Sequence, residues 1–142
     1  MTPADREQLT RDTKTAESAR GPVLRAYQDT KGVWTIGYGT NLQELTIDAA
    51  TAETWLTEKL QSAERECGRF PWFAGLASRR QAALVEMVYN MGMPRLLGFT
   101  NMLQAFADGD FEWAATEALD SKWAGDVGPT RAGRIAAMIR QG

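Results

Sequence analysis

The sequence predicts a mainly helical α+β fold with one small β-hairpin lobe and a larger helical lobe. Apolar residues alternate as in strands between residues 23 and 38, whereas beyond residue 47 they recur at helical spacing. With 44% hydrophobic and 24% charged residues, the chain has the composition of a folded domain. We expect a single domain over residues 1–142, with the β lobe at about 18–46, a connecting helix at about 47–67 and the helical lobe at about 68–142.

The first expected element is a helix that begins at Thr2-Pro3 and ends near Glu17. Threonine is a favoured N-cap residue, and proline suits the first helical position because its missing N–H would have no partner there. Gly21-Pro22 ends the helix. Because residues 2–14 are polar and charged, we expect neither a signal peptide nor a signal anchor.

A β-hairpin follows this helix. A strand begins at Val23, a tight turn spans Asp29 to Gly32, and an alternating strand returns through residues 34–38. The next segment, Thr40 to Leu45, is expected to be a loop.

Asp29 and Thr35 are the polar residues of interest in this hairpin. If the register pairs Tyr27 with Thr35, Asp29 and Thr35 lie diagonally on one face, close enough to share a water molecule. A carboxylate and a hydroxyl directed at one water molecule form half of a hydrolytic site. The alternative is structural, since aspartate is common in turns and threonine in strands.

A long helix is expected to start at Thr46 with Asp48 and to reach Cys67. One of its faces is apolar and the opposite face is charged, which suits a connector between two lobes. Its apolar stripe consists of Ala52, Trp55, Leu56, Leu60 and Ala63. Two lobes joined in this way would leave a cleft between them.

The remainder of the chain is predicted to be helical. Each expected helix follows a capping residue or a helix breaker, namely Ser78, Thr100, Asp110 and Gly128-Pro129-Thr130. Four tryptophans lie at helical spacing among apolar residues and are expected in the core rather than at a sugar site: Trp55, Trp72, Trp113 and Trp123.

The composition excludes several kinds of chemistry. The chain has no histidine, which excludes Ser-His-Asp and Cys-His hydrolases and zinc proteases with histidine ligands. If the protein is an enzyme, carboxylates must move the protons. The single cysteine, Cys67, cannot form an internal disulfide and is expected to be a half-buried helix residue. The net charge of −2 gives no sign of nucleic-acid binding, and no apolar segment approaches the roughly 20 residues of a membrane span.

The hairpin also carries a long motif, Tyr-x-Asp-Thr-x-Gly-x-x-Thr-Ile-Gly-x-Gly. The residues that fit it are Tyr27, Asp29, Thr30, Gly32, Thr35, Ile36, Gly37 and Gly39. This segment resembles the active-site hairpin of the T-even-type phage lysozymes, glycoside hydrolase family 24. The resemblance continues through residues 89–92, 98–101, 121–123 and 130–132 and covers nearly the whole chain.

The general acid is where the chain departs from that family. There, a glutamate closes the first helix directly before a glycine and seven residues before the motif tyrosine. At that distance from Tyr27 this chain has Arg20, which cannot donate a proton at neutral pH, although Gly21 keeps the glycine position. The nearest carboxylate is Glu17, which a three-residue insertion would leave at the negative end of the helix dipole, where a protonated acid is favoured. We expect Glu17 to be the acid.

The resemblance implies the other roles. Glu17 would protonate the leaving oxygen while Asp29 and Thr35 hold the attacking water. Arg131 would face the cleft and pair with the catalytic glutamate, and Asn90 would contact sugar. For Arg131 the alternative is a solvated helix arginine, and for Asn90 it is a role at a helix end.

The function implied is that of a lysozyme-like endolysin, a bacteriolytic and antimicrobial phage enzyme of cell-wall catabolism. It would cleave the β-1,4 bond between N-acetylmuramic acid and N-acetylglucosamine in peptidoglycan as a monomer, without metal or organic cofactor. It would stay in the host cytoplasm before lysis and reach the wall through a holin-type pore. The alternatives are a non-catalytic relative that binds cell-wall glycan or serves as a structural phage part, and a lytic transglycosylase, which the Asp29/Thr35 pair disfavours.

Overall fold

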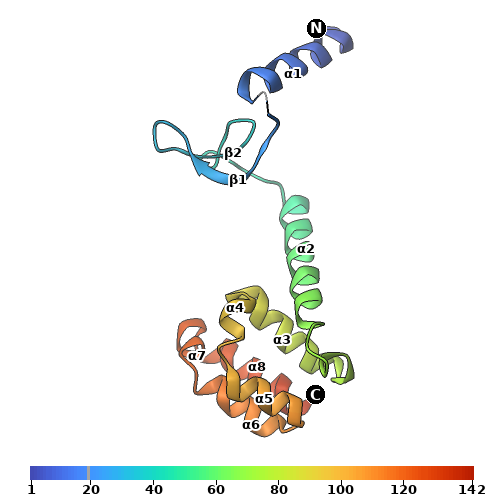
Figure 1. The fold of residues 1–142 in the computed structure, drawn as a ribbon, viewed down its shortest axis with the longest axis vertical. Coiled ribbons are helices and arrows are strands. Elements are labelled where there is room, and N and C mark those ends of the chain that lie inside the picture. Colours follow the sequence, from blue (N-terminus) through green and yellow to red (C-terminus); the bar gives the residue numbers. More distant parts are fainter. Residues whose placement is uncertain (19) are drawn as a thin grey trace. The chain divides into compact units, whose positions relative to one another are not determined.

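The computed structural model describes residues 1–18 and 20–142. They form two compact units, residues 1–48 and residues 49–142, which we call the hairpin unit and the helical unit. The first contains a helix and a small sheet, and the second contains helices only (Figure 1). The predicted mainly helical α+β class is confirmed, while the assignment of the whole chain to one domain stays a prediction.

The hairpin unit begins with helix α1, Pro3–Glu17, whose bounds match the prediction. The Thr2 hydroxyl accepts a hydrogen bond from the Asp5 N–H at 3.2 Å, and the Asp5 carboxylate accepts one from the Thr2 N–H at 3.1 Å. This reciprocal capping box satisfies two donors that the first helical turn would otherwise leave unpaired. At the other end, Ser18 is extended, and its N–H donates to the Lys14 carbonyl.

The sheet consists of three antiparallel strands in the order β1-β2-β3, namely Val23–Gln28, Trp34–Gly37 and Thr40–Asn41. The turn between the first two is closed by the Gly32 N–H, which donates to the Asp29 carbonyl at 3.0 Å. Tyr27 pairs with Thr35, which is the register on which the proposed water site depends.

Strand β3 corrects the prediction of a plain loop after residue 39. Gly37 and Gly39 both have positive φ, at 69° and 89°, and allow the chain to reverse within a few residues. Asn41 then pairs with Thr35 and Thr40 with Ile36. Two residues of alternating sequence are too short a signal to identify a strand, and only the pairing shows it.

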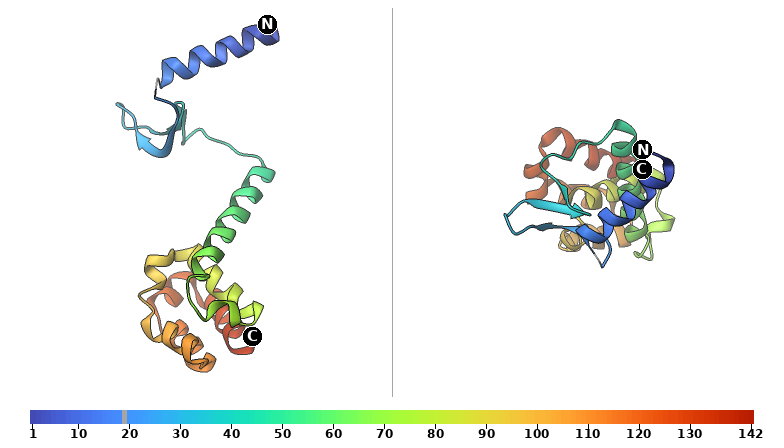
Figure 2. Two further views of the ribbon diagram at one scale, coloured as in Figure 1. Left: turned by 45° about the vertical axis from the view of Figure 1, so that its right-hand side comes forward. Right: turned by 90° about the horizontal axis from the view of Figure 1, so that it is seen from above.

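The helical unit encloses a buried apolar core, and its last helix, α8, packs against other helices of the unit (red in Figure 2). Its elements are α2 (Ala49–Cys67), the 3-10 turn η1 (Phe73–Gly75), α3 (Ser78–Met91), α4 (Met93–Leu96), α5 (Thr100–Asp108), α6 (Phe111–Leu119), α7 (Lys122–Val127) and α8 (Pro129–Gln141). Helix α8 packs against α3, α6 and α7. Its residues Ile135 and Ile139 are completely buried, as are Leu84 and Met87 of α3 and Phe106 of α5.

Several capping predictions are settled by the helix starts. Asp110 caps α6 through the Trp113 N–H, and Gly128-Pro129 opens α8, as expected. The predictions for Ser78 and Thr100 are wrong, because each is the first residue of its helix. A hydroxyl accepts an N–H two or three residues ahead only when its own backbone lies outside the helix, and here Ala77 and Phe99 occupy that position.

The tryptophans divide between core and surface. Trp123 is buried as predicted, and Trp72 is half-buried against the core. Trp55 and Trp113, however, are 47% and 38% exposed, so the prediction that they are core residues is wrong. The Trp113 indole N–H donates to Glu117 one turn later on α6, which satisfies its polar edge at the surface.

Candidate active site

The carboxylate of Glu17 lies against the backbone of Gly39. A Cβ atom placed on Gly39 would be 2.8 Å from Glu17 Oε2 and 3.4 Å from its Cδ, so a side chain at residue 39 would collide with the carboxylate. One turn earlier on α1, Lys14 Nζ lies 5.7 Å from the centre of the Tyr38 ring, within the range of a cation–π contact. These two contacts join the last turn of α1 to the end of the hairpin, both within the hairpin unit.

Arg20 lies beyond the end of α1, at the sequence distance where the family pattern has its glutamate. Its side chain is exposed. The carboxylate that meets the hairpin glycine is therefore three residues earlier in the chain, at Glu17, the last residue of α1. Ala19, within the predicted insertion, lies outside the described residues.

The Asp29 side chain does cap its turn. Its Oδ1 accepts hydrogen bonds from the backbone N–H groups of Lys31 at 2.8 Å and Val33 at 2.9 Å. Both bonds use the same carboxylate oxygen, which fixes the rotamer and leaves Oδ2 for another donor. The structural role expected of an aspartate in a turn is thus present, and it does not consume the whole carboxylate.

Thr35 is buried, with 5% of its surface exposed. It is the only buried residue among the described residues of the hairpin unit. Its hydroxyl donates to the Val33 carbonyl at 2.9 Å. The hydroxyl proton is therefore committed, whereas the oxygen lone pairs can still accept a hydrogen bond. A hydroxyl in this state can orient a water molecule only by accepting one of its protons.

Arg131 and Asn90 both belong to the helical unit. Arg131 Nε, at the start of α8, lies 3.0 Å from Glu86 Oε1 of α3. Arg134 also donates to Glu86 Oε1, and this hydrogen bond raises the pKa of the Arg134 guanidinium. The Asn90 amide oxygen accepts a hydrogen bond from the Trp123 indole at 2.9 Å, which leaves the amide NH₂ to donate.

Glu86 is the residue that sequence reasoning missed. It stands among apolar positions of α3, and a charged residue in an amphipathic helix is ordinarily read as solvent-facing. Arg131 and Arg134 lie one turn apart on α8, and this spacing indicates that a carboxylate elsewhere in the fold pairs with them. Neither residue spacing nor composition says which one.

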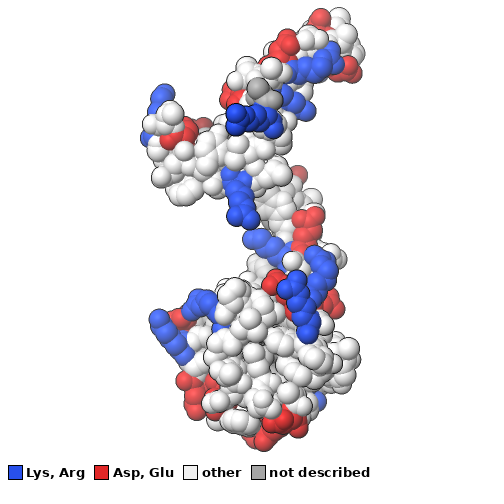
Figure 3. All heavy atoms as spheres, viewed as in Figure 1, with Lys and Arg blue, Asp and Glu red and all other residues white. Residues whose placement is uncertain are grey.

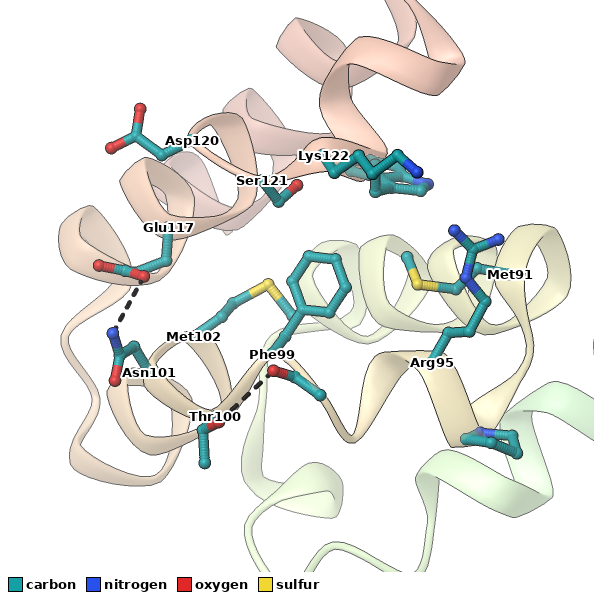
Figure 4. A pocket seen from close by; sticks show the side chains of 13 residues that line it. Met91, Arg95, Phe99, Thr100, Asn101, Met102, Glu117, Asp120, Ser121 and Lys122 are labelled. Atoms are coloured by element: carbon teal, nitrogen blue, oxygen red, sulfur yellow. Dashed lines mark hydrogen bonds between the residues drawn. The ribbon is translucent and has the colours of Figure 1, made fainter.

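A cavity of about 490 Å³ opens in the helical unit where the ends of α3 and α6 approach α5 and α7 (Figure 4). Arg95 and Lys122 lie at one end of it, and Glu117 and Asp120 lie at the other. Phe99 is directed into the space between them. The lining includes the phenylalanine-threonine-asparagine and serine-lysine-tryptophan segments that carried part of the resemblance.

Three further observations on the described part of the chain concern membrane spans, metal ligands and surface charge. No helix there is both long and apolar enough to cross a bilayer. No three acidic, cysteine or histidine side chains among those described gather as metal ligands would. Acidic and basic side chains both occur on the face of the helical unit seen in Figure 3.

Comparison with known proteins adds independent information. The family model described as phage lysozyme matches residues 17–137, so the match begins at Glu17. The chain is also similar to a protein of Dictyostelium discoideum named "Probable T4-type lysozyme 1", with 24% identity in an alignment 152 positions long that spans 86% of this chain and 89% of that protein. The chain therefore belongs to the phage lysozyme family, and this membership supports a lysozyme-like glycoside hydrolase.

Proposed function

We propose that this protein is a peptidoglycan hydrolase that cleaves the β-1,4 bond between N-acetylmuramic acid and N-acetylglucosamine, with Glu17 as the general acid. The observation that carries the proposal is the contact of the Glu17 carboxylate with Gly39. It brings the nearest carboxylate to the hairpin that also bears Asp29 and Thr35. Family membership supports the glycosidase class, and the bond and the residues are our proposal.

In the proposed reaction, the Glu17 carboxyl gives its proton to the glycosidic oxygen as the bond to the anomeric carbon breaks. A water molecule attacks that carbon from the opposite face of the sugar. The Asp29 carboxylate accepts the proton of the water through the oxygen that does not cap the turn. The Thr35 oxygen accepts the second hydrogen of the same water, since its own proton is held by Val33.

Asn90 and Arg131 are proposed as substrate-binding residues. The Asn90 NH₂ group can donate to an acetamido carbonyl or a hydroxyl, because its oxygen is already held by Trp123. Arg131 bonds to Glu86 through Nε, and its terminal nitrogens can donate to an anionic group of the substrate. Peptidoglycan offers such groups in the carboxylates of its peptide stems.

One observation favours a second function. Arg20 occupies the family's glutamate distance, as would be expected of a relative that binds glycan or builds a virion without cleaving the wall. The Glu17 contact with Gly39 favours the catalytic assignment, because it places an acidic side chain against the hairpin that bears Asp29 and Thr35. We also propose that the protein acts as a monomer that stays in the host cytoplasm until a holin-type pore releases it.

Two substitutions test the assignment. Glu17→Gln keeps the size of the side chain and removes the acid, which typically contributes 10²–10⁴-fold to the rate. We expect this variant to lose clearing of peptidoglycan suspensions with an unchanged melting curve. The matched control is Arg20→Ala, which removes an exposed side chain three residues away and should leave clearing largely intact.

The opposite pattern would overturn the proposal. If folded Glu17→Gln clears walls at the wild-type rate, Glu17 is not the acid. If the wild type clears no wall from any host tested but still binds to it, the non-catalytic function is correct.

A further inference from the structure

Two arginines of α8 share one carboxylate of α3. Glu86 Oε1 accepts a hydrogen bond from Arg131 Nε at 3.0 Å and another from Arg134 Nη2. The Glu86 side chain is 23% exposed, whereas Arg131 is 34% and Arg134 52% exposed. The acceptor of the trio is thus its most buried member, and it reaches both arginines from a neighbouring helix.

The helix pair that carries this trio is firmly packed. Ala83 and Met87, on either side of Glu86 along α3, are completely buried. Ala132 and Ile135, which adjoin the two arginines on α8, are buried as well. Because close-packed cores fix the separation of the helices that share them, Glu86 meets the arginines from a constant position. A carboxylate held in this way can define the orientation of an otherwise flexible arginine.

The geometry leaves the binding end of Arg131 available. Among the described residues, Glu86 contacts Arg131 through Nε, so the two terminal NH₂ groups keep their donors for another partner. Arg131 and Glu86 also line a cavity of about 540 Å³ between α2, α3 and α8, together with Tyr89. Glu64 lines the same cavity and Arg134 does not, so the group there that can bind an anion is the Arg131 guanidinium itself.

We propose that Glu86 is a positioning residue that orients the Arg131 guanidinium so that its terminal N–H groups bind a carboxylate of the peptidoglycan stem peptide. This inference rests on the proposed function, since it takes peptidoglycan as the substrate. Arginine recognises a carboxylate through two parallel N–H donors, and this geometry is lost if the guanidinium plane rotates. Preorganisation by Glu86 would prevent that rotation before substrate arrives.

The test compares Arg131→Ala, Glu86→Ala and the double variant, each in the Glu17→Gln background so that no cleavage occurs. The probe is a set of soluble, uncross-linked peptidoglycan fragments, and the readout is their dissociation constant. We expect each single variant to weaken binding about 10-fold or more, and the double variant to be no weaker than Arg131→Ala alone. Glu86→Gln, whose amide oxygen can still accept from Arg131 Nε, should restore most of the affinity.

Two controls separate positioning from a general loss of structure. Arg134→Ala removes the other guanidinium but leaves the Arg131–Glu86 hydrogen bond. Its affinity for the fragments should therefore equal that of the Glu17→Gln protein, which is the reference protein. Fragments whose carboxylates have been converted to amides should bind weakly to the reference protein and equally weakly to Glu86→Ala. A merely structural role of Glu86 would instead lower the melting temperature and weaken both kinds of fragment further.

The inference is overturned if Arg131→Ala weakens binding while Glu86→Ala does not, or if their effects multiply in the double variant. It is also overturned if amidated and native fragments bind alike. Because these measurements record binding, they remain informative if the wild type proves not to cleave the glycan. Failure of the cleavage assignment would be seen separately, in the clearing assay with Glu17.

Discussion

Substitution of Gly39 by alanine offers the most direct test of the site geometry. The new methyl carbon would lie 2.8 Å from Glu17 Oε2 if nothing moved, and an ordinary contact begins near 3.4 Å. The carboxylate must therefore retreat by about half an ångström or rotate away. Because a misplacement of about 1 Å can cost roughly 10²-fold in rate, we expect Gly39→Ala to lose about 10-fold of the clearing activity.

Alanine at this position also strains the backbone, and that effect must be separated. Gly39 has a φ of 89°, a conformation that costs an L-residue roughly 1–2 kcal/mol. Gly37→Ala is the matched control, since Gly37 has a φ of 69° but a Cβ there would meet nothing within 4 Å. Both variants should melt several degrees lower, while only Gly39→Ala should lose activity beyond its loss of stability. Equal activities in the two folded variants would refute the placement of the Glu17 carboxylate.

Three further predictions concern other parts of the chain. Burial and, to a smaller extent, the charges of Glu66 and Glu64 raise the pKa of the Cys67 thiol to about 11. A thiol reagent at pH 8 should therefore label Cys67 only after the protein unfolds. The free energy of unfolding should fall as the pH rises toward 11, because the unfolded chain loses the thiol proton at a lower pH than the folded one. The Thr2 hydroxyl lowers the pKa of the Asp5 carboxyl below 3.8, so the capping box stabilises the helix above that pH. As the pH falls further, the Asp5 carboxylate becomes protonated and this stabilisation is lost. The helicity lost in Thr2→Ala, measured by circular dichroism, should therefore be smaller at pH 2 than at pH 7. If Asp29 directs a water molecule to the face opposite the acid, the first product seen by proton magnetic resonance should have inverted anomeric configuration, and a retained product would remove that role.

The hairpin was the most predictable part of the structure because its information is local. A polar turn, two alternating strands and glycines at the reversal determine which residues pair, and Tyr27 lies opposite Thr35 as the water site requires. Helix α1 was predictable for the same reason, since Thr2, Pro3 and Asp5 together form the capping box. In each case the residues that decide the structure are within a few positions of one another.

The wrong and missed predictions have two causes, a backbone conformation that residue types do not report and contacts between distant elements. Whether Thr100 caps a helix or begins it depends on the backbone of Phe99, which the sequence of hydroxyls does not report. The partner of Arg131 is 45 residues away in the chain, and only the packing of α3 against α8 brings Glu86 to it. Trp113 likewise has a helical spacing that suits the core, yet its face of α6 is left uncovered within the helical unit. Contacts between distant elements are the part of the site that periodicity cannot supply.

Asp29 shows why the structural and the functional explanation of a residue need not compete. The two backbone N–H groups that bind Oδ1 hold the carboxylate in one rotamer, so the turn determines the direction of Oδ2. A group that must orient a water molecule requires that kind of fixed direction, because a freely rotating carboxylate would hold the water in many places. Replacing Asp29 would therefore disturb the turn and the water together. A substitution at Glu17 is easier to interpret, because no hydrogen bond within the described residues holds its carboxylate. Helix α1 does not depend on the contact between that carboxylate and Gly39, so a change in activity would not be caused by a change in the helix.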